Sequence, residues 1–289
     1  MNNKTSDIDK RWGEASPLHE PAILSNFTAR LTDVLITTPP KAGTTWMQQI
    51  LHQLRTGGDS TFTSIDSVVP WLEIQREGKT WQEILQHFES LPEPRVFKTH
   101  CTAEQTPGIG TASIILTSRD PRDCCVSFYH HLMNMTEDAR SNKQIPCPTS
   151  FDDHVEQWLE FKAWYRNVQS WWPYFDHPKV LWLRYQDMKQ DIEPCIDKIT
   201  EFLKWDVTAE QKEKVLEYIS FDWMKAHDEK FSGQGGSSKT QIFKPGKFIR
   251  QGKVGKYKDL MSAEQEHRIL EKAKAMLEPE CLKFLELDI

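Results

Sequence analysis

DVLITTPPKAGTTWMQQILHQL, residues 33–54, is the stretch that decides the fold. Its first six residues form a short apolar run rich in β-branched side chains, which predicts a strand. The loop PPKAG follows at residues 39–43, and after it Trp46, Ile50 and Leu54 recur at helical spacing. The stretch therefore predicts a strand, a glycine-containing loop and a helix in immediate succession.

The same alternation continues along the chain. Three more apolar runs have the length of buried parallel strands: RVFKTH at 95–100, SIILTS at 113–118 and VLWLRY at 180–185. Helical patterns follow in the segment that begins at Pro121, in residues 151–172 and in residues 191–205. Strands that alternate with helices predict an α/β fold in which helices cover both faces of a parallel sheet.

Composition excludes several classes of protein. The 289 residues carry a net charge of −6, which argues against a general nucleic-acid binder. No apolar stretch approaches the ~18 residues that a membrane span needs. The polar N-terminal stretch lacks the apolar core of a signal peptide, so we expect a cytoplasmic protein. The six cysteines contain no C-x-x-C spacing, which argues against a disulfide framework, a zinc site and dithiol redox chemistry.

The loop at residues 39–43 has the chemistry of an anion site. A loop between a strand and a helix presents backbone N–H groups to an anion, and Lys41 adds a positive charge. Gly43 allows close backbone approach, while Thr44 and Thr45 supply hydroxyl groups. In a nucleotide-triphosphatase P-loop the lysine follows the second glycine, whereas here Lys41 precedes Gly43, which disfavours an NTPase or kinase. An ordinary strand-to-helix turn is the alternative.

The segment at residues 229–258 has the weakest periodicity in the chain. It contains GQGGSS, and its part from Phe243 to Lys258 holds six basic residues and no acidic one. One interpretation is a solvated linker, and the other is a mobile basic lid over an anionic ligand. The anion-binding loop elsewhere in the chain favours the lid.

PKAGTTW at residues 40–46 resembles the 5′-phosphosulfate-binding signature of the cytosolic sulfotransferases, which use 3′-phosphoadenosine-5′-phosphosulfate (PAPS). The resemblance continues, in family order, through PWLE (70–73), KTH (98–100), RDPRDCCVSFYHH (119–131), RYQDMKQD (184–191), SFDWMK (220–225) and FIRQGKVGKYKD (248–259). It implies one α/β domain over residues 1–289 with a P-loop-like phosphosulfate loop, and a sulfotransferase that uses PAPS, releases the bisphosphate PAP and requires no metal.

The resemblance also implies which residues bind the donor. Those that match the family's nucleotide site are Lys41, Ala42, Gly43, Thr44, Thr45, Trp46, Arg119, Ser127, Tyr185, Phe221, Arg250, Gln251 and Gly252. Arg119 and Ser127 match the 3′-phosphate ligands, a role that suits a guanidinium and a hydroxyl. Gln251 stands where the family has lysine, and Ile219 where it commonly has threonine. The alternatives are a salt bridge from Arg119 to a neighbouring aspartate, a helix back-bond for Ser127 and core positions for the aromatic residues.

The catalytic residues implied by the resemblance are His100, Lys41 and Lys98. His100 matches the general base, which takes a proton from the acceptor, and an imidazole suits that work near neutral pH. Lys41 matches the cation beside the leaving phosphate oxygen. Lys98 lies two residues before His100, on the same face of a strand, and matches a second catalytic lysine.

The acceptor pocket departs from the phenol- and steroid-sulfating members, which line it with phenylalanines. The matching positions are Trp71, Ile74 and His131, and Cys101–Thr102 replaces a Leu-Pro pair. We therefore expect a small, polar acceptor that offers a hydroxyl, amine or guanidine group, as in the tailoring of a natural product. The alternatives are a phenol- or steroid-type sulfotransferase, an ATP-dependent small-molecule kinase and a non-catalytic nucleotide-binding protein. We expect no nucleic-acid or membrane partner. A homodimer is possible, although residues 272–289 hold no clear match to the family's dimer motif.

Overall fold

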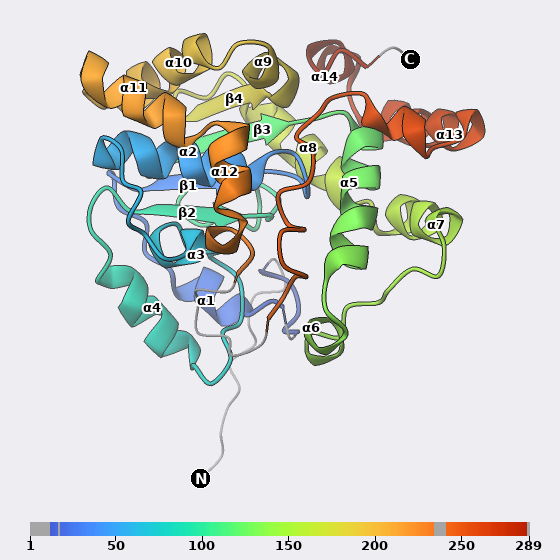
Figure 1. The fold of residues 1–289 in the computed structure, drawn as a ribbon, viewed down its shortest axis with the longest axis horizontal. Coiled ribbons are helices and arrows are strands. Elements are labelled where there is room, and N and C mark those ends of the chain that lie inside the picture. The colour runs from blue at the N-terminus through green and yellow to red at the C-terminus, as the bar shows by residue number, and fades with distance from the viewer. Residues whose placement is uncertain (1–11, 17, 234–240, 288–289) are drawn as a thin grey trace.

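Four parallel strands form the centre of the molecule, in the order β2–β1–β3–β4. Their bounds are β1 Val34–Thr37, β2 Val96–Thr99, β3 Ser113–Ser118 and β4 Val180–Arg184. The computed structural model describes residues 12–16, 18–233 and 241–287. Figure 1 shows the strands at the centre of the fold, with helices on either side. The predicted parallel α/β sheet is confirmed.

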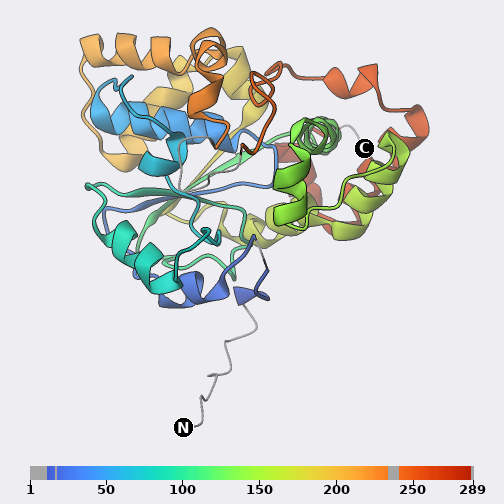
Figure 2. The ribbon, with the colours of Figure 1, turned by 60° about the horizontal axis from the view of Figure 1, so that its bottom comes forward.

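Helices cover both faces of the sheet, as the second view in Figure 2 also shows. One face packs against α2 (Thr44–Thr56), α10 (Glu193–Leu203) and α11 (Ala209–Tyr218). The helices that contribute to the core on the other face are α1 (Pro21–Asn26), α4 (Trp81–Glu89), α5 (Pro121–Asn134), α7 (Phe151–Phe161), α8 (Ala163–Trp171), α13 (Ala263–Met276) and α14 (Pro279–Phe284). The shorter helices are α3 (Ile65–Val68), α6 (Glu137–Asn142), α9 (Tyr185–Gln190) and α12 (Phe221–Ala226).

Alternation along β1 explains why both faces need a cover. Leu35 packs into the core on the α8 side, whereas Val34 and Ile36 pack against α2, and none of the three is more than 1% exposed. The amino ends of β1 and β2 are joined by a buried ion pair in which Arg95 donates to Asp33 at 2.8 and 2.7 Å. The carboxyl ends all meet at the opposite edge of the sheet, where ligands bind in such folds.

Two sequence predictions of secondary structure need correction. Residues 151–172 were expected as one helix, but α7 ends at Phe161 and α8 begins at Ala163. Lys162 between them has a left-handed backbone (φ 55°), which ends the first helix and caps both. The run VLWLRY was expected to be strand throughout, but Tyr185 is the first residue of α9.

The described parts of the segment at residues 229–258 are mostly irregular. Residues 234–240 of this predicted lid lie outside the described residues. The part from residue 241 onward runs between α12 and α5 (Figure 1). Phe243 forms an antiparallel bridge with Met135 at the end of α5, and Lys225 of α12 donates to the carbonyl of Gly246 at 2.7 Å. Within the part of the chain described, no helix has the length and apolar character needed to span a membrane.

Candidate active site

The loop after β1 is held in a shape that exposes the start of α2. Gly43 caps the helix with a left-handed backbone (φ 99°), and a Cβ atom there would lie 2.8 Å from the ring of Tyr185. Only glycine meets both conditions without strain. Thr117 on β3 donates its hydroxyl to the carbonyl of Ala42 at 2.8 Å, which fixes the loop to the sheet. No side chain caps α2, so its first-turn N–H groups face whatever occupies the loop.

Lys41 points from this loop toward α5, where its Nζ atom lies 3.0 Å from Nδ1 of His131. Burial, together with the charges of Lys98 and Arg119, lowers the pKa of Lys41 to about 7. The phenyl ring of Phe248 lies 5.6 Å from the same ammonium. Because cations surround Lys41 and no carboxylate pairs with it among the described residues, the site favours an anion beside it.

His100 follows β2 at the same edge of the sheet and is oriented by two contacts. Its Nδ1 lies 2.8 Å from the carbonyl oxygen of Thr38 and must donate, because a carbonyl only accepts. Its backbone N–H donates to Oε1 of Glu73 at 2.9 Å. Burial and the charge of Lys98 lower the pKa of His100 to about 4, so the imidazole is neutral near pH 7. The lone pair of the neutral ring therefore lies on Nε2.

Lys98 lies beneath Trp71 on the strand that leads to His100. Its ammonium is 4.1 Å from the centroid of the Trp71 ring, and that ring meets His100 edge-on at 5.1 Å. Two backbone hydrogen bonds join this part of β2 to the chain at Pro70–Leu72. Burial lowers the pKa of Lys98. The structure thus brings Lys98, His100 and Trp71 together.

Arg119 directly follows β3 and faces Tyr185, with its guanidinium carbon 4.7 Å from the ring centroid. Its Nη2 donates to the carbonyl of Lys253 at 2.8 Å and lies 3.3 Å from Oδ2 of Asp123. The salt bridge considered as an alternative for Arg119 therefore exists, and its partner is Asp123. The Nε atom of Arg119 is buried and has no hydrogen-bond partner among the described residues.

The aromatic residues of the predicted nucleotide site lie around the loop. Trp46 meets Tyr185 edge-on at 5.7 Å and donates from its indole nitrogen to the carbonyl of Ile219 at 2.9 Å. Phe221 begins α12, and a Cβ atom on Gly252 would lie 2.9 Å from its ring. Gly252, whose φ is 58°, thus lets the segment of residues 248–259 lie directly against Phe221.

The other residues predicted to bind the nucleotide lie in three places. Thr44 is buried and its hydroxyl contacts that of Thr38, while Thr45 stands beside it in the first turn of α2. Ser127 lies half-buried on α5, eight residues after Arg119. Arg250 donates to Oε1 of the exposed Gln251 at 3.0 Å, and burial and the nearby charge of Arg119 lower its pKa.

Of the predicted acceptor residues, Trp71 and His131 border the catalytic groups. The pKa of His131 lies well below its usual range through burial and the charges of Lys41, Lys98 and His100. Its ring is 4.6 Å from Phe243 and 6.0 Å from Phe248. Ile74 is half-buried beyond Glu73, and its carbonyl accepts from Arg76. A role for Ile74 in acceptor binding stays a prediction.

Sequence reasoning missed three groups that shape the site. Thr38 orients His100 through a carbonyl, which no side-chain pattern reveals. Glu73 was visible in the PWLE block but received no role, and its Oε2 atom is buried without a partner among the described residues. Asp123 entered only as a neighbouring aspartate that could pair with Arg119, although it also binds the chain at Gly255.

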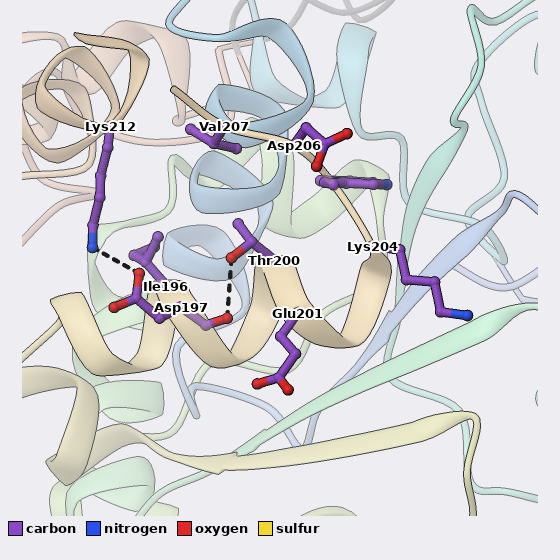
Figure 3. A pocket seen from close by; sticks show the side chains of 9 residues that line it. Ile196, Asp197, Thr200, Glu201, Lys204, Asp206, Val207 and Lys212 are labelled. Atoms are coloured by element: carbon purple, nitrogen blue, oxygen red, sulfur yellow. Dashed lines mark hydrogen bonds and ion pairs between the residues drawn. The ribbon is translucent and has the colours of Figure 1, made fainter. Parts of the chain in front are cut away.

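A cavity of about 570 Å³ lies elsewhere, between α10 and α11. Figure 3 shows the side chains that line it. Lys212 of α11 donates to the carboxylate of Asp197 on α10, and the hydroxyl of Thr200 on the same helix donates to the backbone carbonyl of Asp197. None of its lining residues belongs to the predicted site. Within the described ranges, no group of three or more histidine, cysteine, aspartate or glutamate side chains is arranged to hold a metal ion.

The loop that carries Lys41 lies at the carboxyl edge of a parallel sheet, with the charges of Arg119 and Arg250 nearby and the neutral His100 at the same edge. This arrangement is typical of an α/β group-transfer protein that binds an anionic substrate. The chain belongs to the sulfotransferase family, because the sulfotransferase-domain model matches residues 31–278. It is thus a PAPS-dependent sulfotransferase, and family membership removes the kinase and the non-catalytic alternatives.

Curated relatives agree with this assignment, and solved structures share the fold. Sulfotransferase 1E1 of Rattus norvegicus is 31% identical over 82% of this chain and 80% of its own length. Sulfotransferase 1C2 of Homo sapiens is 28% identical over 97% of this chain and 98% of its own length. A mouse sulfotransferase solved with PAP has a TM-score of 0.72 at 24% identity, covering 92% of this chain and 91% of its own. A retinol dehydratase solved with retinol and PAP has a TM-score of 0.67 at 21% identity over 92% and 85%. The two structures confirm the fold.

Proposed function

We propose that this sulfotransferase transfers a sulfuryl group from PAPS to a hydroxyl, amine or guanidine group of a small polar acceptor. His100 acts as the general base, and Lys41 and Lys98 stabilise the negative charge. The single observation that carries the acceptor class is the 3.0 Å contact between Lys41 and His131, which puts a second imidazole beside the catalytic groups.

His100 suits the role of base because its hydrogen bond to Thr38 leaves Nε2 free to accept a proton. In the transfer step, the acceptor O–H or N–H loses its proton to His100 as its oxygen or nitrogen bonds to sulfur. The bond between sulfur and the phosphate oxygen breaks, and PAP leaves with the electron pair. The negative charge of the bound donor raises the pKa of His100 from its low value, which makes the ring a stronger base.

The two lysines act on the oxygens that gain charge. Lys41 extends from the loop that faces the phosphosulfate, and Lys98 approaches from β2 next to His100. Sulfuryl transfer resembles phosphoryl transfer, in which positioning and charge stabilisation supply most of the catalysis. Burial strengthens both interactions, because few waters remain to screen them.

The nucleotide end of the donor lies toward α5 and the described part of the predicted lid. We assign its 3′-phosphate to Arg119, Ser127 and Arg250. The buried, unpartnered Nε atom of Arg119 supports this assignment, because a phosphate oxygen would satisfy it. Trp46, Tyr185 and Phe221 supply the faces and edges for the adenine. The two relatives solved with PAP support the choice of nucleotide.

The acceptor end carries more hydrogen-bonding groups than an apolar pocket would. A protonated Lys41 can only donate, so Nδ1 of His131 accepts and the ring proton lies on Nε2. His100 then offers an acceptor atom and His131 offers a donor. An acceptor molecule with a nucleophilic O–H or N–H beside a second polar group satisfies both imidazoles, whereas a plain hydrocarbon ring would leave one unpaired.

A phenol- or steroid-type acceptor is the second candidate. The rings of Phe128, Phe243 and Phe248 lie 6.0, 4.6 and 6.0 Å from His131, and the ring of Trp71 lies 5.1 Å from that of His100. A flat apolar acceptor would pack against these rings. The same pocket therefore offers contacts to both polar and phenolic acceptors.

The experiment is incubation with PAPS and two sets of acceptors, followed by mass spectrometry for the addition of one SO₃ group. One set holds polar alcohols, amines and guanidines, and the other holds phenols and hydroxysteroids. We expect transfer to the polar set, and we expect His131→Phe to shift the preference toward phenols. His130→Phe is the control, because it makes the same change one residue away on α5. Transfer to phenols alone, with no effect of His131→Phe, would overturn the polar acceptor.

Location and assembly are also proposals. A cytoplasmic location fits the reducing state that six free cysteines need, five of them buried. Light scattering of the purified protein would distinguish a monomer from a homodimer.

A further inference from the structure

Asp123 is a buried carboxylate that joins α5 to the segment at residues 253–257. Its Oδ2 accepts from the backbone N–H of Gly255 at 2.8 Å, and its Oδ1 accepts from that of Tyr257 at 3.1 Å. The side chain is 1% exposed. Gly255 can present its N–H in this way because its backbone is left-handed (φ 75°). One carboxylate thus fixes a stretch of chain more than a hundred residues away.

Arg119 contacts both the carboxylate and the segment. Its Nη2 lies 3.3 Å from Oδ2 of Asp123 and donates to the carbonyl of Lys253 at 2.8 Å. The position of the guanidinium therefore depends on Asp123 and on the segment together. Its Nε atom is left without a partner among the described residues, and leaving such a buried donor unpaired is costly.

We infer that Asp123 is a positioning residue that holds Arg119 and the 253–257 segment in one arrangement, so that the 3′-phosphate binds only when the segment is in place. This inference rests on the proposed assignment of Arg119 to the 3′-phosphate. Coupling of this kind works both ways: the nucleotide that gains affinity from the ordered segment also stabilises the segment.

An amide cannot replace the carboxylate. Asp123 faces two backbone N–H groups and one guanidinium, and all three are donors. An asparagine side chain accepts at its oxygen but brings an NH₂ group, which would meet a donor. Asp123→Asn therefore disturbs the arrangement with almost no change in volume.

The test compares the Kd for PAP with the Kd for adenosine 5′-monophosphate (AMP), which lacks the 3′-phosphate. Calorimetry on Asp123→Asn should show the preference for PAP reduced on the order of tenfold or more. Asp120→Asn is the matched control, since Asp120 caps the same first turn of α5 by accepting from the N–H of Arg122. It should leave the preference unchanged. A merely structural role for Asp123 would lower stability and leave the PAP-to-AMP ratio as it is, which would overturn the inference.

Arg119→Ala tests the assignment of Arg119 to the 3′-phosphate separately from the positioning role of Asp123. If it removes the preference for PAP while Asp123→Asn keeps it, the role of Asp123 is wrong and that of Arg119 stands. If neither variant changes the preference, the assignment of Arg119 fails, and the inference fails with it.

Hydrogen exchange of the unmodified protein tests the same point should Asp123→Asn not fold. The amides of Gly255 and Tyr257 should exchange more slowly with saturating PAP than with saturating AMP. Equal exchange in the two complexes would contradict a link between the 3′-phosphate and the segment.

Discussion

Lys41 on the loop after β1 lies 3.0 Å from His131 on α5, although 90 residues separate them in the sequence. Lys41 is expected to bind the phosphosulfate of PAPS, and His131 is expected to line the acceptor pocket. The contact therefore links the two predicted binding sites. Burial and the charges of Lys98 and Arg119 lower the pKa of Lys41 to about 7. An anion bound beside Lys41 would raise that pKa again.

PAP binding should therefore take up protons at mildly alkaline pH. At pH 8 most of the ligand-free protein has lost the Lys41 proton, and the bound phosphate restores it. Calorimetry in buffers of different ionisation enthalpy should give an uptake of up to about one proton per PAP. Lys41→Met should remove most of this uptake. A binding enthalpy that is the same in all buffers would contradict the prediction.

Arg119→Ala should weaken PAP binding by about 1.5–3 kcal/mol, the usual loss for a hydrogen bond to a charged group. AMP binding should change much less, because AMP carries no 3′-phosphate. Parallel titrations with the two nucleotides measure this difference. An equal loss for both would place Arg119 away from the 3′-phosphate.

Gly43→Ala should destabilise the protein and impair the loop. The new Cβ atom would stand 2.8 Å from Tyr185 in a left-handed backbone, at a combined cost on the order of 1–3 kcal/mol. Gly78→Ala is the control, because Gly78 also has a positive φ (69°) but a Cβ atom added there would meet nothing within 4 Å. Denaturant unfolding should give the larger loss for Gly43→Ala. Equal losses would show that the contact with Tyr185 is unimportant.

Acid should destabilise the ligand-free protein between pH 6.5 and 4. Burial lowers the pKa of both His52 and His100 to about 4, so they stay neutral in the folded state where unfolded histidines are protonated. The unfolded state then binds more protons, and the free energy of unfolding falls as the pH falls. Each histidine contributes a slope of at most about 1.4 kcal/mol per pH unit. Urea unfolding of His52→Gln should show a shallower dependence on pH; an unchanged slope would contradict the prediction.

The parts of the fold that sequence could predict are those set by local chemistry. The strand, loop and helix of residues 33–54 follow from apolar periodicity and one glycine, and so does the proline start of α5. The break at Lys162 was not predictable, because lysine is not a residue that favours a left-handed backbone. The contacts Lys41–His131 and Asp123–Gly255 were not predictable either, since each joins distant segments that only the packed sheet and α5 bring together.

The most direct test of the proposed mechanism is the turnover of His100→Ala with PAPS and an acceptor that the unmodified protein sulfates in the mass-spectrometry panel, measured beside the affinity of the variant for PAP. Loss of a general base should reduce turnover about 10²–10⁴-fold. Affinity for PAP should stay close to that of the unmodified protein, because the imidazole faces the acceptor. That pair of results would support His100 as the group that takes the acceptor proton. Near-normal turnover of His100→Ala would contradict it.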